Sequence, residues 1–136
     1  MLQTETIPKE LYTRLGYLFY ALAMVDGTIE SAEIKKLTQT IKERWLPLEE
    51  SFDEFGSPAA FQIISVFDWL EANDSFSNDA YDAFATFFRR NKHHVDAATR
   101  QNILQTAVDI ALAFGGENKS EHTFIEKLKK LLGEKA

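Results

Sequence analysis

A short acidic turn near the N-terminus holds residue types that could bind a metal ion. Asp26 is followed by Gly27, and Glu33 lies six residues after the glycine. In a calcium loop of the EF-hand kind, these residues would be the fifth-position ligand, the turn glycine and the final bidentate acid. The first and third ligand positions are Leu22 and Met24, whose side chains cannot coordinate a hard cation. The spacing therefore excludes a complete EF-hand loop and leaves a partial site that needs oxygen ligands from elsewhere in the fold.

The same turn also has a purely structural explanation. Gly27 suits the position that closes a helix, because glycine adopts positive φ without steric cost. Glu30 and Glu33 have the spacing of a capping box, in which Glu33 reaches back to the N–H of the N-cap residue. Ile29 and Ile34 then stand where a hydrophobic staple requires apolar residues. Helix capping and metal binding are thus two interpretations of one acidic turn.

The composition is that of one globular domain, spanning 1–136, and it excludes several functions. The chain has 136 residues, a net charge of −6 and no cysteine. A chain of this length can bury a hydrophobic core without disulfides or metals to staple it. The missing cysteines exclude disulfides, thiolate catalysis and zinc–thiolate sites. The acidic balance argues against nucleic-acid binding, which depends on neutralisation of phosphates by lysine and arginine.

The sequence carries no catalytic motif. It contains no nucleophile–base pairing, no phosphate-binding loop and no H-E-x-x-H zinc motif, so we expect a protein that is not an enzyme. The apolar run at 15–25 keeps helical spacing and is too short to span a bilayer, so it predicts a buried first helix. Together with the lack of cysteine, this favours a cytoplasmic protein.

Helical periodicity runs through the chain, and no segment alternates with the period of a strand. Residues 1–8, which end in a proline, are predicted as a polar lead-in to the first helix. Caps are expected at Ser77, Asp96 and Ser120. The pattern predicts a compact all-α bundle of about six to seven helices, structured over about 9–133. The predicted helices are 9–25, 30–45, 58–72, 78–91, 97–114 and 121–132.

Two of the predicted helices are rich in aromatic residues. In 58–72, one face is expected to point inward, with Ile63, Val66 and Trp69 beside it. That face consists of Phe61, Ile64, Phe67 and Leu70. Aromatic residues at helical spacing are typical of a core rather than of a cofactor site. The helix at 78–91 is therefore expected to bury its aromatic stripe, which consists of Tyr81, Phe84, Phe87 and Phe88.

The two ends of the chain resemble each other. Ala21-Leu22-Ala23 before the acidic turn is matched by Ala111-Leu112-Ala113 before Gly115-Gly116, and an amphipathic helix follows each turn. The second turn carries Glu117 and Glu121. Two related helix–turn–helix halves could pair so that their turns approach one another, which would bring the acidic residues of both turns together.

At these residues the sequence resembles the TerB-like family, named for tellurite-resistance proteins. The match is the pattern A-x-x-D-G-x-I-x-x-x-E from Ala23 to Glu33, and the resemblance covers about 9–133. It implies a compact all-α domain in which acidic residues of both motifs gather near one surface and bind metal ions. Gly115 stands where the family's second motif has an aspartate, so Glu121, with Glu117 as a substitute, would supply the ligands there. The resemblance further implies a non-enzymatic role in stress response or in membrane-associated complexes.

Two functions are consistent with these patterns. The first is a metal-binding module, whose oxygen ligands suit Ca²⁺, Mg²⁺ or Mn²⁺ rather than Zn²⁺. The second is a protein–protein interaction module whose acidic turn only caps helices, with a contact surface on the aromatic helices or on the acidic connector 49–54. In either case we expect protein partners, any membrane association through those partners, and no nucleic acid. The candidate metal ligands are Asp26, Glu30, Glu33, Glu117 and Glu121.

Overall fold

The computed structural model describes residues 2–25, 31–45, 58–73, 77–113 and 119–133. Within these ranges the chain forms α-helices and one 3₁₀ turn, and no strand, which confirms the predicted all-α fold. Of these described helices, none combines the length and the apolar character needed to cross a membrane. The elements are α1 (Leu2–Ala23), α2 (Ser31–Trp45), α3 (Pro58–Ala72), α4 (Ser77–Asn91), η1 (Lys92–His94), α5 (Ala97–Ala113) and α6 (Lys119–Leu132).

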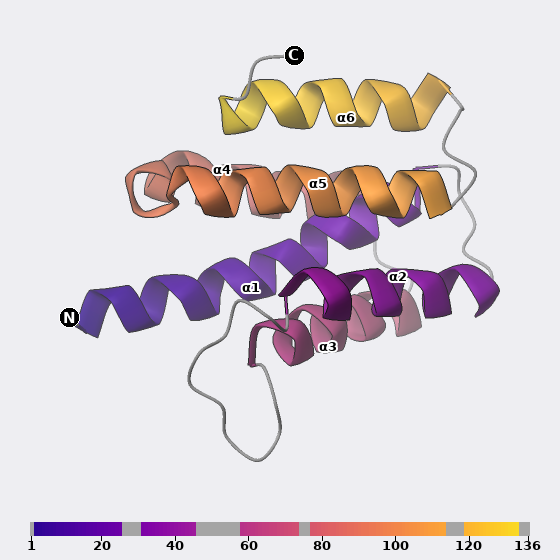
Figure 1. Ribbon diagram of the computed structural model, residues 1–136, viewed down its shortest axis with the longest axis horizontal. Coiled ribbons are helices and arrows are strands. Elements are labelled where there is room, and N and C mark those ends of the chain that lie inside the picture. The colour runs from indigo at the N-terminus through magenta and orange to yellow at the C-terminus, as the bar shows by residue number, and fades with distance from the viewer. Residues whose placement is uncertain (1, 26–30, 46–57, 74–76, 114–118, 134–136) are drawn as a thin grey trace.

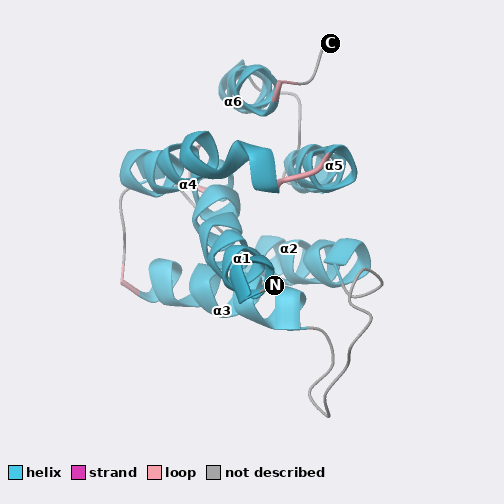
Figure 2. Cartoon of the chain, turned by 90° about the vertical axis from the view of Figure 1, so that its left-hand side faces the viewer, coloured by secondary structure: helices cyan, strands magenta, loops and turns pink. Residues whose placement is uncertain are grey.

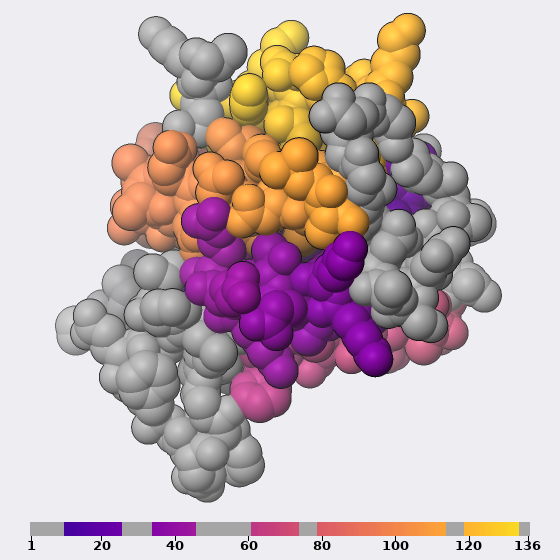
Figure 3. Space-filling model, turned by 45° about the vertical axis from the view of Figure 1, so that its right-hand side comes forward, coloured from indigo at the N-terminus to yellow at the C-terminus, as the bar shows by residue number. Residues whose placement is uncertain are grey.

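The helices are arranged in layers around α1, which crosses the centre of the molecule (Figure 1). Figure 2 shows α2 and α3 on one side of α1, and α4 and α5 on the other. α1 packs against α3, α4 and α5, and α2 packs against both α3 and α5. α6 is the outermost helix and packs on α5, so that α2 and α6 lie on opposite sides of α5 (Figure 3).

The central position of α1 explains why this helix is buried on nearly every side. The leucines at 11, 15, 18 and 22 are buried along one stripe of the helix, and so are residues on its other faces, including Phe19, Tyr20 and Ala21. Gly16 marks the closest approach to α3. A Cβ atom there would lie 2.6 Å from Cβ of Val66 and 2.9 Å from the carbonyl oxygen of Ile63. A larger residue would therefore push α1 and α3 apart.

The contact at Gly16 also explains a wrong prediction for α3. Phe61 is 53% exposed and Trp69 is 60% exposed, whereas the inward face carries Ile63, Phe67 and Leu70. Apolar residues occur all around α3, so its periodicity fits two overlapping faces. The backbone of α1 approaches on the side of Ile63, and this contact decides which face is buried. In α4, by contrast, the predicted aromatic stripe is buried throughout.

Several helix ends differ from the prediction, and α4 includes Ser77, which the sequence predicts as its cap. α1 begins at Leu2, so the lead-in predicted over 1–8 is helical, and Pro8 lies inside the helix, where its missing N–H leaves one hydrogen bond unmade. α6 begins at Lys119 and includes Ser120, which the sequence predicts as its cap. Serine is tolerated within a helix at small cost, so a serine alone does not mark where a helix begins. Gly133 directly follows α6 and has φ of 79°, the conformation in which a glycine commonly ends a helix.

Candidate functional site

The elements that flank the two acidic turns meet at one end of the molecule. Figure 1 shows the C-terminal ends of α1 and α5 and the N-terminal ends of α2 and α6 on the same side. The turns themselves, 26–30 and 114–118, lie outside the described residues, so the expectation that they come together stays a prediction. We call the five ligands that the sequence predicts the acidic corner: Asp26, Glu30, Glu33, Glu117 and Glu121.

Of the five predicted ligands, Glu121 is the one whose side chain the structure describes. Asp26, Glu30 and Glu117 lie outside the described residues, and so does the predicted capping box. Glu33 lies in the first turn of α2, but its side chain is also outside the described part. Within the described part of the chain, no group of three or more histidine, aspartate or glutamate side chains comes together. The described side chains alone therefore do not form a metal centre.

Glu121 is buried, which is unusual for a carboxylate. The residue is 1% exposed, and its Oε1 atom is shielded from solvent. Because α6 begins at Lys119, Glu121 falls in the first turn, where the positive end of the helix dipole favours a negative charge. It shares the inward face of α6 with Phe124 and Leu128, at the i, i+3 and i+7 spacing. This spacing is visible in the sequence and already indicates a buried glutamate.

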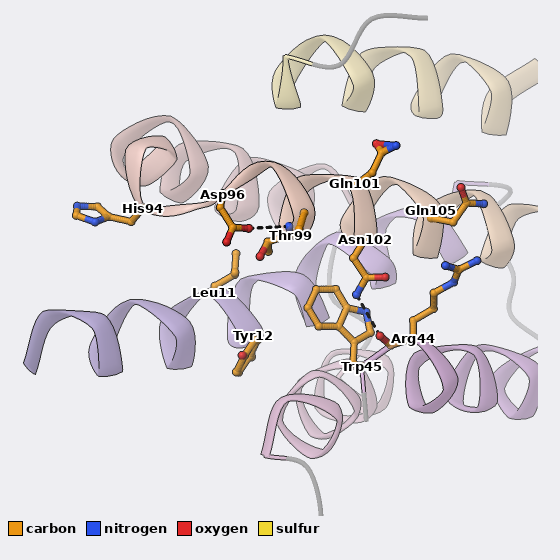
Figure 4. A pocket seen from close by; sticks show the side chains of 11 residues that line it. Leu11, Tyr12, Arg44, Trp45, His94, Asp96, Thr99, Gln101, Asn102 and Gln105 are labelled. Atoms are coloured by element: carbon orange, nitrogen blue, oxygen red, sulfur yellow. Dashed lines mark hydrogen bonds between the residues drawn. The ribbon is translucent and has the colours of Figure 1, made fainter. Parts of the chain in front are cut away.

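A hollow lies where α1, the end of α2 and the start of α5 meet (Figure 4). We call it the α2–α5 cleft; it has a volume of about 690 Å³ and is lined largely by polar side chains. Sequence reasoning did not identify it, because its residues come from elements far apart in the chain. Its lining includes Leu11, Tyr12, Arg44, Trp45, His94, Asp96, Thr99, Gln101, Asn102 and Gln105.

The polar groups at this cleft hold the end of α2 against α5. Arg44 forms an ion pair with Asp109, in which its Nε and Nη2 atoms each lie 2.8 Å from Oδ2 of the carboxylate. Asn102 donates from Nδ2 to the carbonyl oxygen of Arg44 at 3.1 Å, near the end of α2 where carbonyls lack intrahelical partners. The indole N–H of Trp45 donates to Oγ1 of Thr106 at 3.1 Å. These interactions satisfy buried polar groups and fix two helices together.

Asp96 at the edge of the cleft is the N-cap of α5, as the sequence predicts. The backbone N–H of Thr99 donates to its Oδ1 at 2.8 Å. Hydrogen bonds from Thr99, through its side chain and its backbone, hold the pKa of Asp96 below the usual value for an aspartate, against a small opposing effect of burial. Figure 4 shows His94 pointing away from the other lining residues. The lining charges thus have structural roles, and the arrangement lacks an acid–base pair aimed at a common point.

Similarity to known proteins was found for nearly the whole chain. A family model described as "Tellurite resistance protein TerB" matches residues 14–135, which include both acidic turns. No curated protein sequence and no solved structure shows significant similarity to the chain.

Proposed function

The chain belongs to the TerB family, and from that premise we propose that it is a non-enzymatic helical module that binds a divalent cation at its acidic corner. The observation that carries the proposal is the burial of Glu121 at the end of the molecule where α1 and α5 end and α2 and α6 begin. Removal of a carboxylate from water is costly unless its charge is compensated. A cation held jointly by Glu121 and the acids of the first turn would add to the interactions that Glu121 already makes.

The chemistry of the donors decides which ions fit. Carboxylate oxygens bind hard cations, so Ca²⁺, Mg²⁺ and Mn²⁺ are favoured over Zn²⁺, which prefers nitrogen and sulfur. The low dielectric around a buried carboxylate strengthens its attraction to the ion relative to a surface group. Glu121 would be the fixed ligand, because its helix and its burial restrain it before the ion arrives.

The wider role follows from the family and from the sequence. We propose a part in the response to tellurite or metal stress, in the cytoplasm, with protein partners that link the module to membrane complexes. The non-enzymatic character rests on the sequence, which lacks a nucleophile–base pair, a phosphate loop and a zinc-protease motif.

A thermal melt of chelator-treated protein tests metal binding. Ca²⁺, Mg²⁺ and Mn²⁺ are titrated separately at constant ionic strength. At about a hundred times the dissociation constant, a single site stabilises the fold by roughly 2.7 kcal/mol. Glu121→Gln and Asp26→Asn should each remove the ion-dependent rise in melting temperature. Asp68→Asn is the matched control, since it removes one exposed carboxylate from α3.

The outcomes separate the hypotheses. A saturable rise that is absent in both corner variants and retained in the control supports the proposal. If both corner variants keep the full rise, the ion binds elsewhere. No rise for the wild-type protein at millimolar ion contradicts metal binding and leaves the acidic residues as helix caps.

The alternative function, a protein–protein interaction module, is favoured by the exposed side of α3. Phe61 and Trp69 are two of the large apolar residues that the structure exposes. Trp69 also borders a shallow groove of about 320 Å³, which is lined by Thr13, Tyr17, Ser65 and Val66 as well. The aromatic residues of α4 are buried and cannot form such a surface. The acidic connector 49–54 lies outside the described residues.

Surface substitutions distinguish the alternative. The double variant Phe61→Gln/Trp69→Gln should fold normally, because both residues are largely exposed. Leu112→Gln is the control, since Leu112 is equally exposed on a different helix at 61%. In cells that depend on this protein for tellurite tolerance, loss of tolerance in the α3 variant but not in Asp26→Asn favours the interaction module. The opposite pattern favours the metal module.

A further inference from the structure

A second cleft, between the C-terminal halves of α4 and α6, concentrates positive charge. It has a volume of about 480 Å³, and the residues that α6 contributes to it lie in the C-terminal half of that helix. Its base is formed by Tyr81, Phe88 and Leu131. We call it the basic cleft, because the remaining lining residues are all cations: Arg89, Lys92, Lys127 and Lys130.

Among the described residues, no carboxylate pairs with any of the four cations. None of the described lining residues is acidic. Some basic residues outside the cleft are paired with acids, whereas others, such as Arg90, form no ion pair with the described residues. Arg14 and Arg44 are paired with acids, and Lys129, which does not line the cleft, is paired with Glu126. The basic cleft is therefore a local concentration of positive charge in a chain whose net charge is −6.

Helix dipoles explain only part of this arrangement. Arg89 and Lys130 lie in the last turns of α4 and α6, where a positive charge complements the dipole. Lys127 lies outside the last turn, and its Nζ atom is 4.4 Å from the centre of the Tyr81 ring. The C-terminal carbonyl of Leu132 already accepts a hydrogen bond from Arg100 at 3.1 Å. The dipoles of α4 and α6 therefore do not account for all four cations of the basic cleft.

The base of the cleft is rigid and includes one hydroxyl group. The Tyr81 ring packs edge-on against Phe124, with ring centres 5.4 Å apart, and the guanidinium of Arg100 covers the Phe88 ring at 5.2 Å. Burial raises the pKa of the Tyr81 hydroxyl; the charge of Arg89 acts in the opposite direction and that of Asp82 in the same direction. The hydroxyl is thus protonated at neutral pH and can act as a hydrogen-bond donor.

We propose that the basic cleft binds a small anion that carries two or more phosphate groups. Lysine and arginine side chains are the usual protein partners of phosphate oxygens, as point charges and as planar forks respectively. Four cations exceed the charge of a single phosphate monoester, so linked phosphates match the site better. The apolar base leaves room for the carbon skeleton to which the phosphates are attached. This site is separate from the acidic corner and does not depend on metal binding there.

Isothermal titration calorimetry with sodium triphosphate tests the proposal, in chelator-treated protein at constant ionic strength. The double variant Lys127→Gln/Lys130→Gln should weaken binding at least tenfold. The matched control is Lys35→Gln/Lys36→Gln, which removes the same charge from exposed positions on α2 and should leave the affinity within about twofold. A parallel arm measures sedimentation with vesicles that contain a phosphorylated inositol lipid, with vesicles lacking it as reference.

Each outcome decides the question. Saturable binding that is lost in the cleft variant and kept in the control supports the proposal. The arm in which it occurs shows whether the phosphates come from a free molecule or from a lipid headgroup. Equal weakening in both double variants would mean that only net charge matters, and this overturns the proposal. Absence of binding to triphosphate and to the vesicles at millimolar phosphate also overturns it.

Discussion

Asp96 and Glu121 both place a carboxylate at the N-terminal end of a helix, but in opposite environments. Asp96 precedes α5 and is exposed. It caps the helix by accepting a hydrogen bond from the backbone N–H of Thr99 at 2.8 Å. Glu121 lies inside the first turn of α6 and is 1% exposed. The helix dipole favours both charges, by a few tenths to about 1 kcal/mol at exposed sites.

The difference teaches that burial, rather than a place at a helix terminus, separates these two acids. An exposed cap needs no burial, and serine, threonine or asparagine would serve in its place. A buried carboxylate carries a desolvation cost that its surroundings must offset. The proposed cation at the acidic corner would add to the interactions that Glu121 already makes.

The largest effect is expected from reversal of the buried charge. Glu121→Lys would place an ammonium group in the buried first turn of α6, where the dipole also opposes it, and should destabilise the fold by about 3 kcal/mol or more. Ser120→Lys, at the exposed neighbouring position, should cost less than about 1 kcal/mol. Denaturant unfolding measures both. Similar values for the two variants would mean that Glu121 is not buried in solution.

The next largest effect concerns the far end of α6, which Arg100 fixes to the rest of the fold. Its guanidinium donates to the carbonyl oxygens of Val95 at 2.9 Å, Leu132 at 3.1 Å and Lys92 at 2.6 Å. Arg100→Ala should reduce the free energy of unfolding by about 2 to 4 kcal/mol, since these carbonyls lose a charged donor. Arg90→Ala, at an exposed position of α4, should stay within about 0.5 kcal/mol. Comparable losses would show that Arg100 does not anchor α6.

A smaller effect is expected at the exposed cap. Asp96→Ala removes the acceptor for the Thr99 N–H and should cost about 1 kcal/mol, whereas Asp96→Asn retains a capping oxygen and should cost a few tenths. Chemical denaturation at neutral pH measures both. The ion-dependent stabilisation should be unchanged in either variant, because Asp96 lies outside the acidic corner. Loss of the ion response in Asp96→Asn would contradict the assignment of the metal to the corner.

The smallest effect is a pH dependence at the same residue. Because the pKa of Asp96 is lower in the folded chain, its charge stabilises the fold fully above the unfolded value of about 4. This contribution is lost as the pH falls through the folded pKa. The stability difference between the wild type and Asp96→Asn should therefore be constant above about pH 5 and shift against the wild type in acid. A difference that stays constant down to the acid limit would show that Asp96 is not a charged cap.

The sequence predicts the fold well where a helix has one apolar face and a strong breaker. α3 is predicted with its observed bounds, because Ser57-Pro58 favours a helix that begins at the proline, and Asn73 follows its last residue. Its buried face is predicted only in part: Phe67 is buried as expected, whereas Phe61 is exposed, since apolar residues surround the helix and the approach at Gly16 is a tertiary effect. The extension of α1 to Leu2 is missed for a related reason, because packing and neighbouring turns can hold a helix through a proline.

The candidate sites are predictable to different degrees. The acidic corner follows from local motifs, and the burial of Glu121 follows from its spacing to Phe124 and Leu128. The basic cleft and the α2–α5 cleft join side chains from separate helices. Arg89 and Lys127, for example, are 38 positions apart in the chain, and no local pattern connects them. Such sites depend on helix packing, which a single sequence does not specify.

The central claim, a cation at the acidic corner, is tested most directly by paramagnetic line broadening. Substoichiometric Mn²⁺ is added to ¹⁵N-labelled, chelator-treated protein, and the amide signals are followed. The account predicts that the amides of 23–25 and 119–121 broaden first, that those of Lys92–His94 stay sharp, and that excess Ca²⁺ or Mg²⁺ restores the signals. Broadening that begins around exposed acids such as Asp68 and Glu71, with the corner unaffected, would contradict it.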